Sequence, residues 1–223
     1  MFNKIQLDCI GSTNDFALEL LARDPGNYMI TALEQTHGRT TKATRWHSPR
    51  GNMFLTMTIL WERERLPALS LITALSVIEA IGPRDSIKIK WPNDILANVQ
   101  KAGGILIEYD GEHAIIGIGI NTAIRPPPGI IPYPTTSLAA EGISIEPIDL
   151  ANIIAARLLE NIILSSPEVV ERMRPHMYKI GKRIFVLSQG KMLEGRFDDL
   201  APNGALILDG RQIISGELTK ENF

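Results

Sequence analysis

The sequence predicts an α+β protein, in which a mixed β-sheet with helices packed against it is followed by a small β-barrel. Two observations predict this. Through residue 178, short β-rich runs occur among long helical patterns. After Lys179 only short runs remain, separated by turn pairs such as Asn203-Gly204 and Asp209-Gly210. We therefore expect two domains, residues 1–178 and 179–223.

The elements of the first domain follow from periodicity and from turn residues. Runs rich in β-branched and large apolar residues predict strands at 5–10, 28–33, 54–60, 87–91, 102–109 and 114–120. Helical spacing predicts helices at 16–21, 66–81, 149–165 and 167–178. Ser12 or Thr13 is the expected N-cap of the first helix, and Gly82-Pro83 ends the second, which we expect to be amphipathic.

Three further segments complete the expected fold. Residues 36–51 lack periodicity and are dense in Thr, Arg and Gly, which predicts a long loop. Asp110-Gly111 predicts a hairpin between the last two strands of the first sheet. The C-terminal strands are expected at 182–187, 192–200, 205–208 and 212–218.

Composition excludes several classes of protein. A fraction of 44% hydrophobic residues is that of a globular chain, and a net charge of -2 argues against broad nucleic-acid binding. The single cysteine, Cys9, permits no intrachain disulfide and is expected to be a small core residue. The sequence contains neither a signal-peptide pattern nor an apolar span of membrane length, so we expect a cytoplasmic location without membrane contact.

The most informative segment runs from Lys90 to Glu108. A strand breaks at Pro92, whose ring removes a backbone donor, and the following turn presents Asn93 and Asp94. Lys101 then enters the next strand, ahead of two glycines that allow close approach of a ligand. This combination suits binding of a phosphate or carboxylate, although an ordinary hairpin with solvated charges explains the spacing equally well.

The same segment resembles the signature of the biotin protein ligases, which combines Lys-Trp-Pro-Asn-Asp with Lys-x-x-Gly-Ile-Leu-x-Glu. Further blocks match in the same order, and the resemblance covers essentially the whole chain: Ser12-Thr13-Asn14, Trp46 with Ser48-Pro49-x-Gly51, and Gly117-Ile118-Gly119-Ile120-Asn121. The C-terminal module is similar to the SH3-like domain of that family. Only about ten residues precede Ser12, so we expect a short form without the DNA-binding domain of some members.

The resemblance implies a two-step reaction. Biotin and ATP, with Mg²⁺, give biotinyl-5′-AMP, and a lysine of a biotin carboxyl carrier domain of acetyl-CoA carboxylase or a related carboxylase then takes the biotin. By match to the family pattern, the catalytic residues are Lys101, Asp94 and Arg39. The implied biotin site is Ser12, Thr13, Asn14, Gln35, Gly38, Lys101, Gly103 and Gly104. The implied ATP and adenylate site is Arg39, Thr41, Lys42, Trp46, Lys90, Asn93 and Asn121. No protein ligand to a metal is predicted.

The loop from Gly38 to Trp46 departs from the family pattern Gly-Arg-Gly-Arg-x-Gly-Arg-x-Trp. Thr40 and Ala43 replace glycines, and Thr41 and Thr44 replace arginines. Because β-branched residues resist positive φ and threonine carries no charge, this loop could work through hydroxyls, release the adenylate early, or leave a protein that only binds biotin.

Two rival functions stay open beside the ligase. The first is a lipoate or octanoate ligase, which shares the fold and the transfer of an acyl group to lysine. The second is the binding-only homologue, for which the altered loop is the argument. The family resemblance also suggests a homodimer joined through a sheet edge, for which 114–120 is the expected strand.

Overall fold

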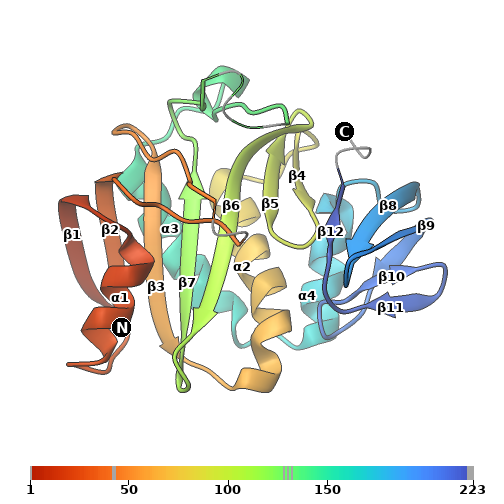
Figure 1. Ribbon diagram of the computed structural model, residues 1–223, viewed down its shortest axis with the longest axis horizontal. Coiled ribbons are helices and arrows are strands. Elements are labelled where there is room, and N and C mark those ends of the chain that lie inside the picture. The colour runs from red at the N-terminus through yellow and green to blue at the C-terminus, as the bar shows by residue number, and fades with distance from the viewer. Residues whose placement is uncertain (1, 42–43, 128, 130, 132, 220–223) are drawn as a thin grey trace.

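The computed structural model describes residues 2–41, 44–127, 129, 131 and 133–219. Its main feature is a seven-stranded mixed sheet in the order β1-β2-β3-β7-β6-β5-β4 (Figure 1). The strands are β1 (Asn3–Ile10), β2 (Tyr28–Gln35), β3 (Met53–Leu60), β4 (Ile87–Lys90), β5 (Asp94–Ala97), β6 (Gln100–Tyr109) and β7 (His113–Ile120). Only β1 and β2 pair in parallel within this sheet.

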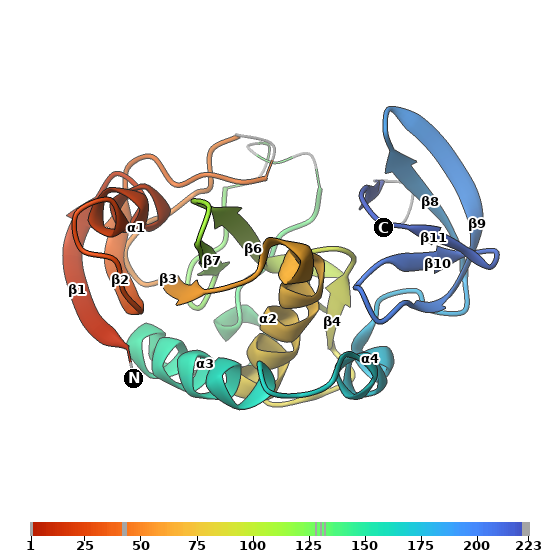
Figure 2. The same cartoon turned by 90° about the horizontal axis from the view of Figure 1, so that it is seen from below.

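Helices cover the two faces of this sheet unequally (Figure 2). α2 (Leu66–Ile81) and α3 (Pro147–Asn161) pack together on one face, with α4 (Ser166–Met173) against α2. α1 (Thr13–Leu21) lies on the other face, where it contacts β2, β3 and β7. Short 3-10 turns at Arg63–Arg65, Ala139–Glu141 and Arg174–His176 complete the helical elements of the described chain.

Helix α2 has the predicted bounds but not the predicted character. Eleven of its 16 residues are buried, because the sheet, α3 and α4 surround it. The expected amphipathic pattern was wrong, since a helix enclosed on most sides is apolar around most of its circumference. The last two predicted helices are shorter than expected: α3 ends at Asn161, and α4 gives way to a 3-10 turn that contains Pro175.

Strand alternation gives the central hairpin β6–β7 two different faces. Ile105 and Ile118 join the core beneath the helices, whereas Gly104, Leu106 and Gly117 belong by alternation to the face that carries α1. The register places Gly104 opposite Gly119. Two adjacent positions on the α1 face therefore have no side chain, which leaves room for other groups to lie close to the sheet.

Three expectations about strands need correction. Residues 94–97 form a strand, β5, which the short turn-rich segment did not suggest. β7 lies between β3 and β6, so the proposed dimer edge at 114–120 is internal to the sheet and its backbone groups are already paired. Cys9 is exposed rather than buried, because it lies on the edge strand β1.

The C-terminal module is a second, five-stranded antiparallel sheet in the order β11-β10-β9-β8-β12. Its strands are β8 (Arg183–Ser188), β9 (Lys191–Leu200), β10 (Leu206–Leu208), β11 (Arg211–Ile213) and β12 (Glu217–Leu218). The predicted strand at 212–218 is thus divided between β11 and β12, at opposite edges. The division of the chain at residue 179 remains a prediction about independent folding.

The turn before β10 joins this module to the first sheet. The Trp91 indole Nε1 donates to the carbonyl oxygen of Gly204 at 3.1 Å, in a buried position. Gly204 has φ +85°, and a Cβ there would lie 2.6 Å from the carbonyl oxygen of Pro67, in the first turn of α2. Glycine is required at this position both for its backbone conformation and for the close approach.

We predict that Gly204→Ala lowers the free energy of unfolding by more than Gly210→Ala does. Gly210 has a similar φ of +74°, but a Cβ there meets no atom of the described chain within 4 Å. The control should lose about 1 kcal/mol from backbone strain, and Gly204→Ala should lose about 1–3 kcal/mol more from the clash. Urea denaturation measures both, and equal losses would refute the close-approach explanation.

Candidate functional site

A cavity opens on the α1 face of the main sheet, where the glycines of β6 and β7 leave room. Many of the predicted site residues line it: Ser12, Thr13, Asn14, Gln35, Arg39, Thr41, Trp46, Asn93, Asp94, Lys101 and Gly104. The remaining lining residues are Thr40, Leu55, Ile105, Leu106, Gly117, Ile118 and Gly119. The cavity therefore joins the start of α1, the loop after β2, the turn before β5 and the central hairpin.

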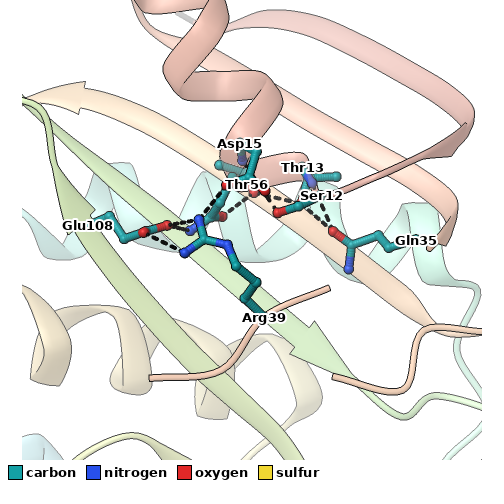
Figure 3. A network of polar contacts seen from close by, with 8 residues as sticks. Ser12, Thr13, Asp15, Gln35, Arg39, Thr56 and Glu108 are labelled. Carbon is teal, nitrogen blue, oxygen red and sulfur yellow. Dashed lines mark hydrogen bonds and ion pairs between the residues drawn. The ribbon is translucent and has the colours of Figure 1, made fainter. Parts of the chain in front are cut away.

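A chain of hydrogen bonds holds the polar end of the cavity (Figure 3). The Ser12 hydroxyl caps α1 by accepting from the Asp15 amide, and the backbone and hydroxyl of Thr13 both donate to Gln35 Oε1, at 2.8 and 3.0 Å. Gln35 Nε2 donates in turn to Ser48 Oγ at 3.2 Å. Thr13 and Gln35 are thus fixed by each other, and a bound ligand would meet side chains that are already ordered.

The buried hydroxyl of Thr56 supports this end of the cavity from β3. Its Oγ1 lies 2.6 Å from Asn14 Oδ1 and 2.8 Å from Thr13 Oγ1. A Cβ at Gly117 would lie 2.4 Å from Asn14 Oδ1, so the absence of a side chain on β7 admits the Asn14 amide. The sequence signal for this support is a pair of threonines, Thr56 and Thr58, in an otherwise apolar strand, and the resemblance did not include it.

Lysine and carboxylate groups form the opposite end of the cavity. Lys101 Nζ lies 2.5 Å from Asp94 Oδ1, and Lys90 Nζ lies 3.4 Å from Asp94 Oδ2. Burial alone disfavours the charged lysine, but the Asp94 carboxylate and the Tyr133 hydroxyl outweigh it and raise the pKa of Lys101 above its ordinary value. For Lys90, burial dominates and lowers the pKa. Lys101 is therefore harder to deprotonate than a free lysine, whereas Lys90 is easier to deprotonate.

Trp46 covers the floor formed by the two opposed glycines. A Cβ at Gly119 would lie 2.6 Å from Trp46 Nε1, and one at Gly104 would lie 3.6 Å from the far ring of the indole. The ring also lies beside Lys101, whose Nζ is 5.4 Å from its centroid. Its Nε1 is buried and has no hydrogen-bond partner among the described residues. The flat sheet surface is what permits an indole to lie across the cavity.

The altered loop is more regular than its sequence suggests. Arg39 and Arg45 form an antiparallel bridge, and the Thr40 amide donates to the carbonyl of Thr44 at 3.0 Å. The two threonine hydroxyls lie 2.7 Å apart. β-branched residues favour such extended pairing. The described part of the loop is therefore the stem of a hairpin; Lys42 and Ala43 lie outside the described residues.

Several predicted site residues do not line the cavity. Gly38 and Gly103 pack closely against neighbours, since a Cβ at either position would come within 2.6 Å of Ser48 Oγ or of the Ile120 side chain. Asn121 is buried at 1% exposure and donates to the carbonyl of Thr136, while its Oδ1 has no partner in the described part of the chain. Lys90 contacts Asp94 but is not among the described residues that line the cavity.

The cavity has the features of a binding site for a small, partly anionic molecule. Ordered amide and hydroxyl groups at one end, and a fixed lysine with a carboxylate at the other, suit a small polar molecule that carries an anionic group. The indole that lies on the glycine floor adds a flat apolar surface to the same cavity. Within the described ranges, no cluster of three or more His, Cys, Asp and Glu residues is arranged to hold a metal ion.

Comparison with known proteins identifies the family. The chain belongs to the Biotin/lipoate A/B protein ligase family, whose model matches residues 7–121. It is 30% identical to a biotin–[acetyl-CoA-carboxylase] ligase of Paracoccus denitrificans over 91% of this chain and 94% of that protein. It is 36% identical to the bifunctional ligase/repressor BirA of Bacillus subtilis, over 68% of this chain but only 50% of that protein.

Solved structures give the same result over the full fold, including the C-terminal sheet. A mutant biotin protein ligase from Aquifex aeolicus in complex with biotin has a TM-score of 0.83 and 25% identity, with 97% of each chain covered. A biotin protein ligase from Leishmania major in complex with biotinyl-5-AMP has a TM-score of 0.72 and 30% identity, with 98% of each chain covered. No helix in the described part of the present chain is long and apolar enough to cross a membrane.

We predict that Lys90→Met raises the free energy of unfolding by about 1 kcal/mol, because it removes a buried charge and leaves Asp94 paired with Lys101. Because the pKa of Lys90 is lowered in the folded protein, burial of its charge destabilises the fold most at pH values below that lowered pKa. This destabilisation disappears as the pH rises towards the ordinary value of 10.5, where the unfolded chain also loses the proton. The gain should therefore shrink at alkaline pH. Thermal denaturation at several pH values measures it.

Lys88→Met is the matched control for this prediction. It removes the same charge from the same strand, but the Lys88 side chain is 27% exposed and donates to the carbonyl of Pro175. A neutral or slightly lower stability is expected for the control. If Lys90→Met lost stability while Lys88→Met did not, Lys90 would be a net stabilising residue and the pKa argument would be wrong.

Proposed function

We infer that this protein is a biotin–[acetyl-CoA-carboxylase] ligase, which activates biotin with ATP and transfers it to a lysine of a carrier protein. The observation that carries this function is the meeting of Lys101 with the ordered Thr13–Gln35 pair in one cavity. Relatives over nearly the full length of the chain are ligases of this name. Structures similar over the full length contain biotin and ATP, or biotinyl-5-AMP.

The polar end of the cavity is the proposed binding place of the biotin ring. A ureido group has one carbonyl acceptor and two N–H donors, and the side chains at this end offer both kinds of partner. Gln35 Oε1 already accepts from Thr13, and Asn14 Oδ1 from Thr56, so their orientations are set before a ligand arrives. Leu106, whose side chain belongs to the α1 face and which also lines the cavity, suits the thiophane ring or the valeryl chain.

The first chemical step requires cations near the acid. A biotin carboxylate oxygen attacks the α-phosphorus of ATP, and the bond from that phosphorus to the pyrophosphate oxygen breaks. Because two anions must approach, Lys101 with its raised pKa is suited to hold both the carboxylate and the α-phosphate. Arg39, whose pKa is also raised by its hydrogen bond to Glu108, is a second cation on the cavity wall.

The second step requires a neutral amine. The ε-amine of the carrier lysine attacks the acyl carbon of the adenylate, AMP leaves, and the nitrogen loses a proton. Asp94 is the proposed group that orients this amine and receives the proton, since it lines the cavity directly beside Lys101. The proposed nucleotide contacts are Trp46, Asn93 and Thr41 on the cavity wall, with Lys90 acting through Asp94.

Mg²⁺ is proposed to arrive as the complex with ATP. The described residues hold no three-ligand acidic or histidine cluster, so the triphosphate is the expected source of most of its ligands. A bound Mg²⁺ would neutralise phosphate charge. Two predicted nucleotide residues are not part of this proposal. Asn121 is not among the described residues that line the cavity, and Lys42 lies outside the described residues.

An assay with the substrates tests the proposed function directly. Purified protein with biotin, ATP and Mg²⁺ should release pyrophosphate and should then biotinylate an isolated carrier domain; chelation with EDTA should abolish both steps. Single-turnover quenching separates adenylate formation from transfer to lysine. Replacing biotin by lipoate should give less product at equal concentration. Lipoate activity above biotin activity would favour the acyl-ligase alternative, and tight biotin binding without pyrophosphate release would establish the binding-only alternative.

We predict that Lys101 acts mainly in adenylate formation and Asp94 mainly in transfer to lysine. Lys101→Ala should slow adenylate formation by about 10²–10³-fold, because it removes the cation at the developing charge. Asp94→Asn should slow transfer from preformed biotinyl-5′-AMP by about 10²-fold, with a smaller effect on adenylate formation, because an amide cannot accept the proton. Supplying synthetic biotinyl-5′-AMP to both variants makes the comparison. Equal loss of transfer in both would contradict this division of roles.

A further inference from the structure

Arg39 is held by two carboxylates that come from different elements. Its Nη1 and Nη2 donate to Glu108 Oε1 and Oε2 of β6, each at 3.0 Å, in a two-pronged contact. Its Nη2 also donates to Asp15 Oδ1 of α1 at 2.5 Å. Figure 3 shows the guanidinium between these two acids. A side chain that starts on a loop is thereby fixed to a strand and to a helix.

The donor count of Arg39 leaves a specific gap. A guanidinium has five N–H groups, and the three contacts above use three of them, all on Nη1 and Nη2. The Nε atom is buried and has no hydrogen-bond partner among the described residues. A buried donor without a partner costs free energy unless an acceptor joins it. Two N–H groups, that of Nε and the second one on Nη1, therefore remain for an acceptor that these three contacts do not supply.

The positions of the two acids suggest what they do. Arg39 is among the residues that line the cavity, whereas neither Glu108 nor Asp15 is among the described lining residues. The acids thus contact the arginine without forming the cavity wall themselves. The side chains of Arg39, Asp15 and Glu108 are 34, 47 and 24% exposed, so these ion pairs contribute little to global stability. Their geometric effect on Arg39 is the larger one.

Glu108 also contacts Asn14, near the start of α1. Its Oε2 accepts from Asn14 Nδ2 at 2.8 Å as well as from Arg39. One carboxylate oxygen therefore fixes both an amide at the proposed biotin-ring end and the arginine. A glutamine at this position would keep an acceptor for Asn14 but would lose the charged, two-pronged contact with the guanidinium.

We propose that Glu108, assisted by Asp15, is a positioning residue that fixes Arg39 on the cavity wall so that its guanidinium donates to an anionic phosphate oxygen of the bound nucleotide. This role rests on the proposed function, because it assumes that ATP binds in this cavity. Glu108 acts through Arg39 and touches neither substrate. The roles of the two carboxylates differ in strength: Glu108 binds both terminal nitrogens, and the more exposed Asp15 binds one.

The test measures nucleotide binding by calorimetry, with adenosine 5′-(α,β-methylene)triphosphate as the probe at saturating biotin. Glu108→Gln should raise the Kd of this analogue about two- to fivefold, and Asp15→Asn should raise it less, as expected for partly exposed pairs. The Kd of biotin alone should change less than that of the nucleotide, and KM for ATP should rise more than kcat falls. The melting temperature should stay close to that of the wild type.

Matched controls remove one charge nearby without touching Arg39. Glu112→Gln is the control for Glu108→Gln, because Glu112 lies in the turn after β6. Glu19→Gln is the control for Asp15→Asn, because Glu19 lies one turn further along α1. Both residues are exposed. A double-mutant cycle completes the design. In an Arg39→Ala background, Glu108→Gln should change the nucleotide Kd by less than about 1.5-fold, because the group through which it acts is gone.

The outcomes are separable. If the wild type forms no adenylate and binds no analogue, the proposed function fails and this inference falls with it. If the wild type is active but Glu108→Gln behaves like Glu112→Gln, only the positioning role is overturned. It is equally overturned if Glu108→Gln weakens nucleotide binding by the same factor with and without Arg39. Tighter nucleotide binding in Asp15→Asn would show that this acid competes with phosphate instead of assisting.

Discussion

The register between β6 and β7 is the constraint on which the site depends. It sets Gly104 directly opposite Gly119, on the face that carries α1. A shift of β6 by one residue would turn Ile105 to that face and would place its side chain where Gly104 now leaves room. The same register leaves Gly117 free to admit the Asn14 amide and Gly119 free to admit the Trp46 indole. The central hairpin thus serves as both the core of the sheet and the floor of the site.

Charge pairing explains how so many ionic groups share a small space. Each described cation on the cavity wall has an acid beside it: Lys101 has Asp94, and Arg39 has Glu108 and Asp15. Pairing offsets the cost of removing these groups from water. An anionic substrate must then be bound by cations that already have partners, so it gains from their positions more than from their net charge.

The sequence predicted most of the elements because their periodicity is strong. The bounds of α2, the C-terminal change to short strands and the hairpin at Asp110 were all accessible to pattern. β5 escaped because four residues beside a turn carry no period, and the central position of β7 escaped because strand order depends on long-range pairing. Cys9 shows that an apolar run on an edge strand can still be exposed.

The site was predictable only as a set of residues. The blocks around Ser12, Asp94 and Lys101 meet in one cavity, and their roles there remain predictions. Which of them form the wall was not predictable, because it depends on approach distances: Gly103 packs into the sheet, whereas Gly104 faces the cavity. The supporting groups Thr56 and Glu108 act from neighbouring strands, and no local pattern marks a side chain for that task.

Hydrogen bonds hold the base of the hairpin stem that follows Gly38. At its base, the Trp46 amide donates to the carbonyl of Gly38 at 2.8 Å, and Ser48 ties the Trp46 carbonyl to Gln35. Arg39 and Trp46, which line the cavity, both lie at this pinned base. Thr40 and Thr44 pair with each other further along the stem than these contacts. The base of the stem is thus held by contacts to Gly38, Gln35 and Ser48, none of which involves Thr40 or Thr44, two of the residues that depart from the family pattern.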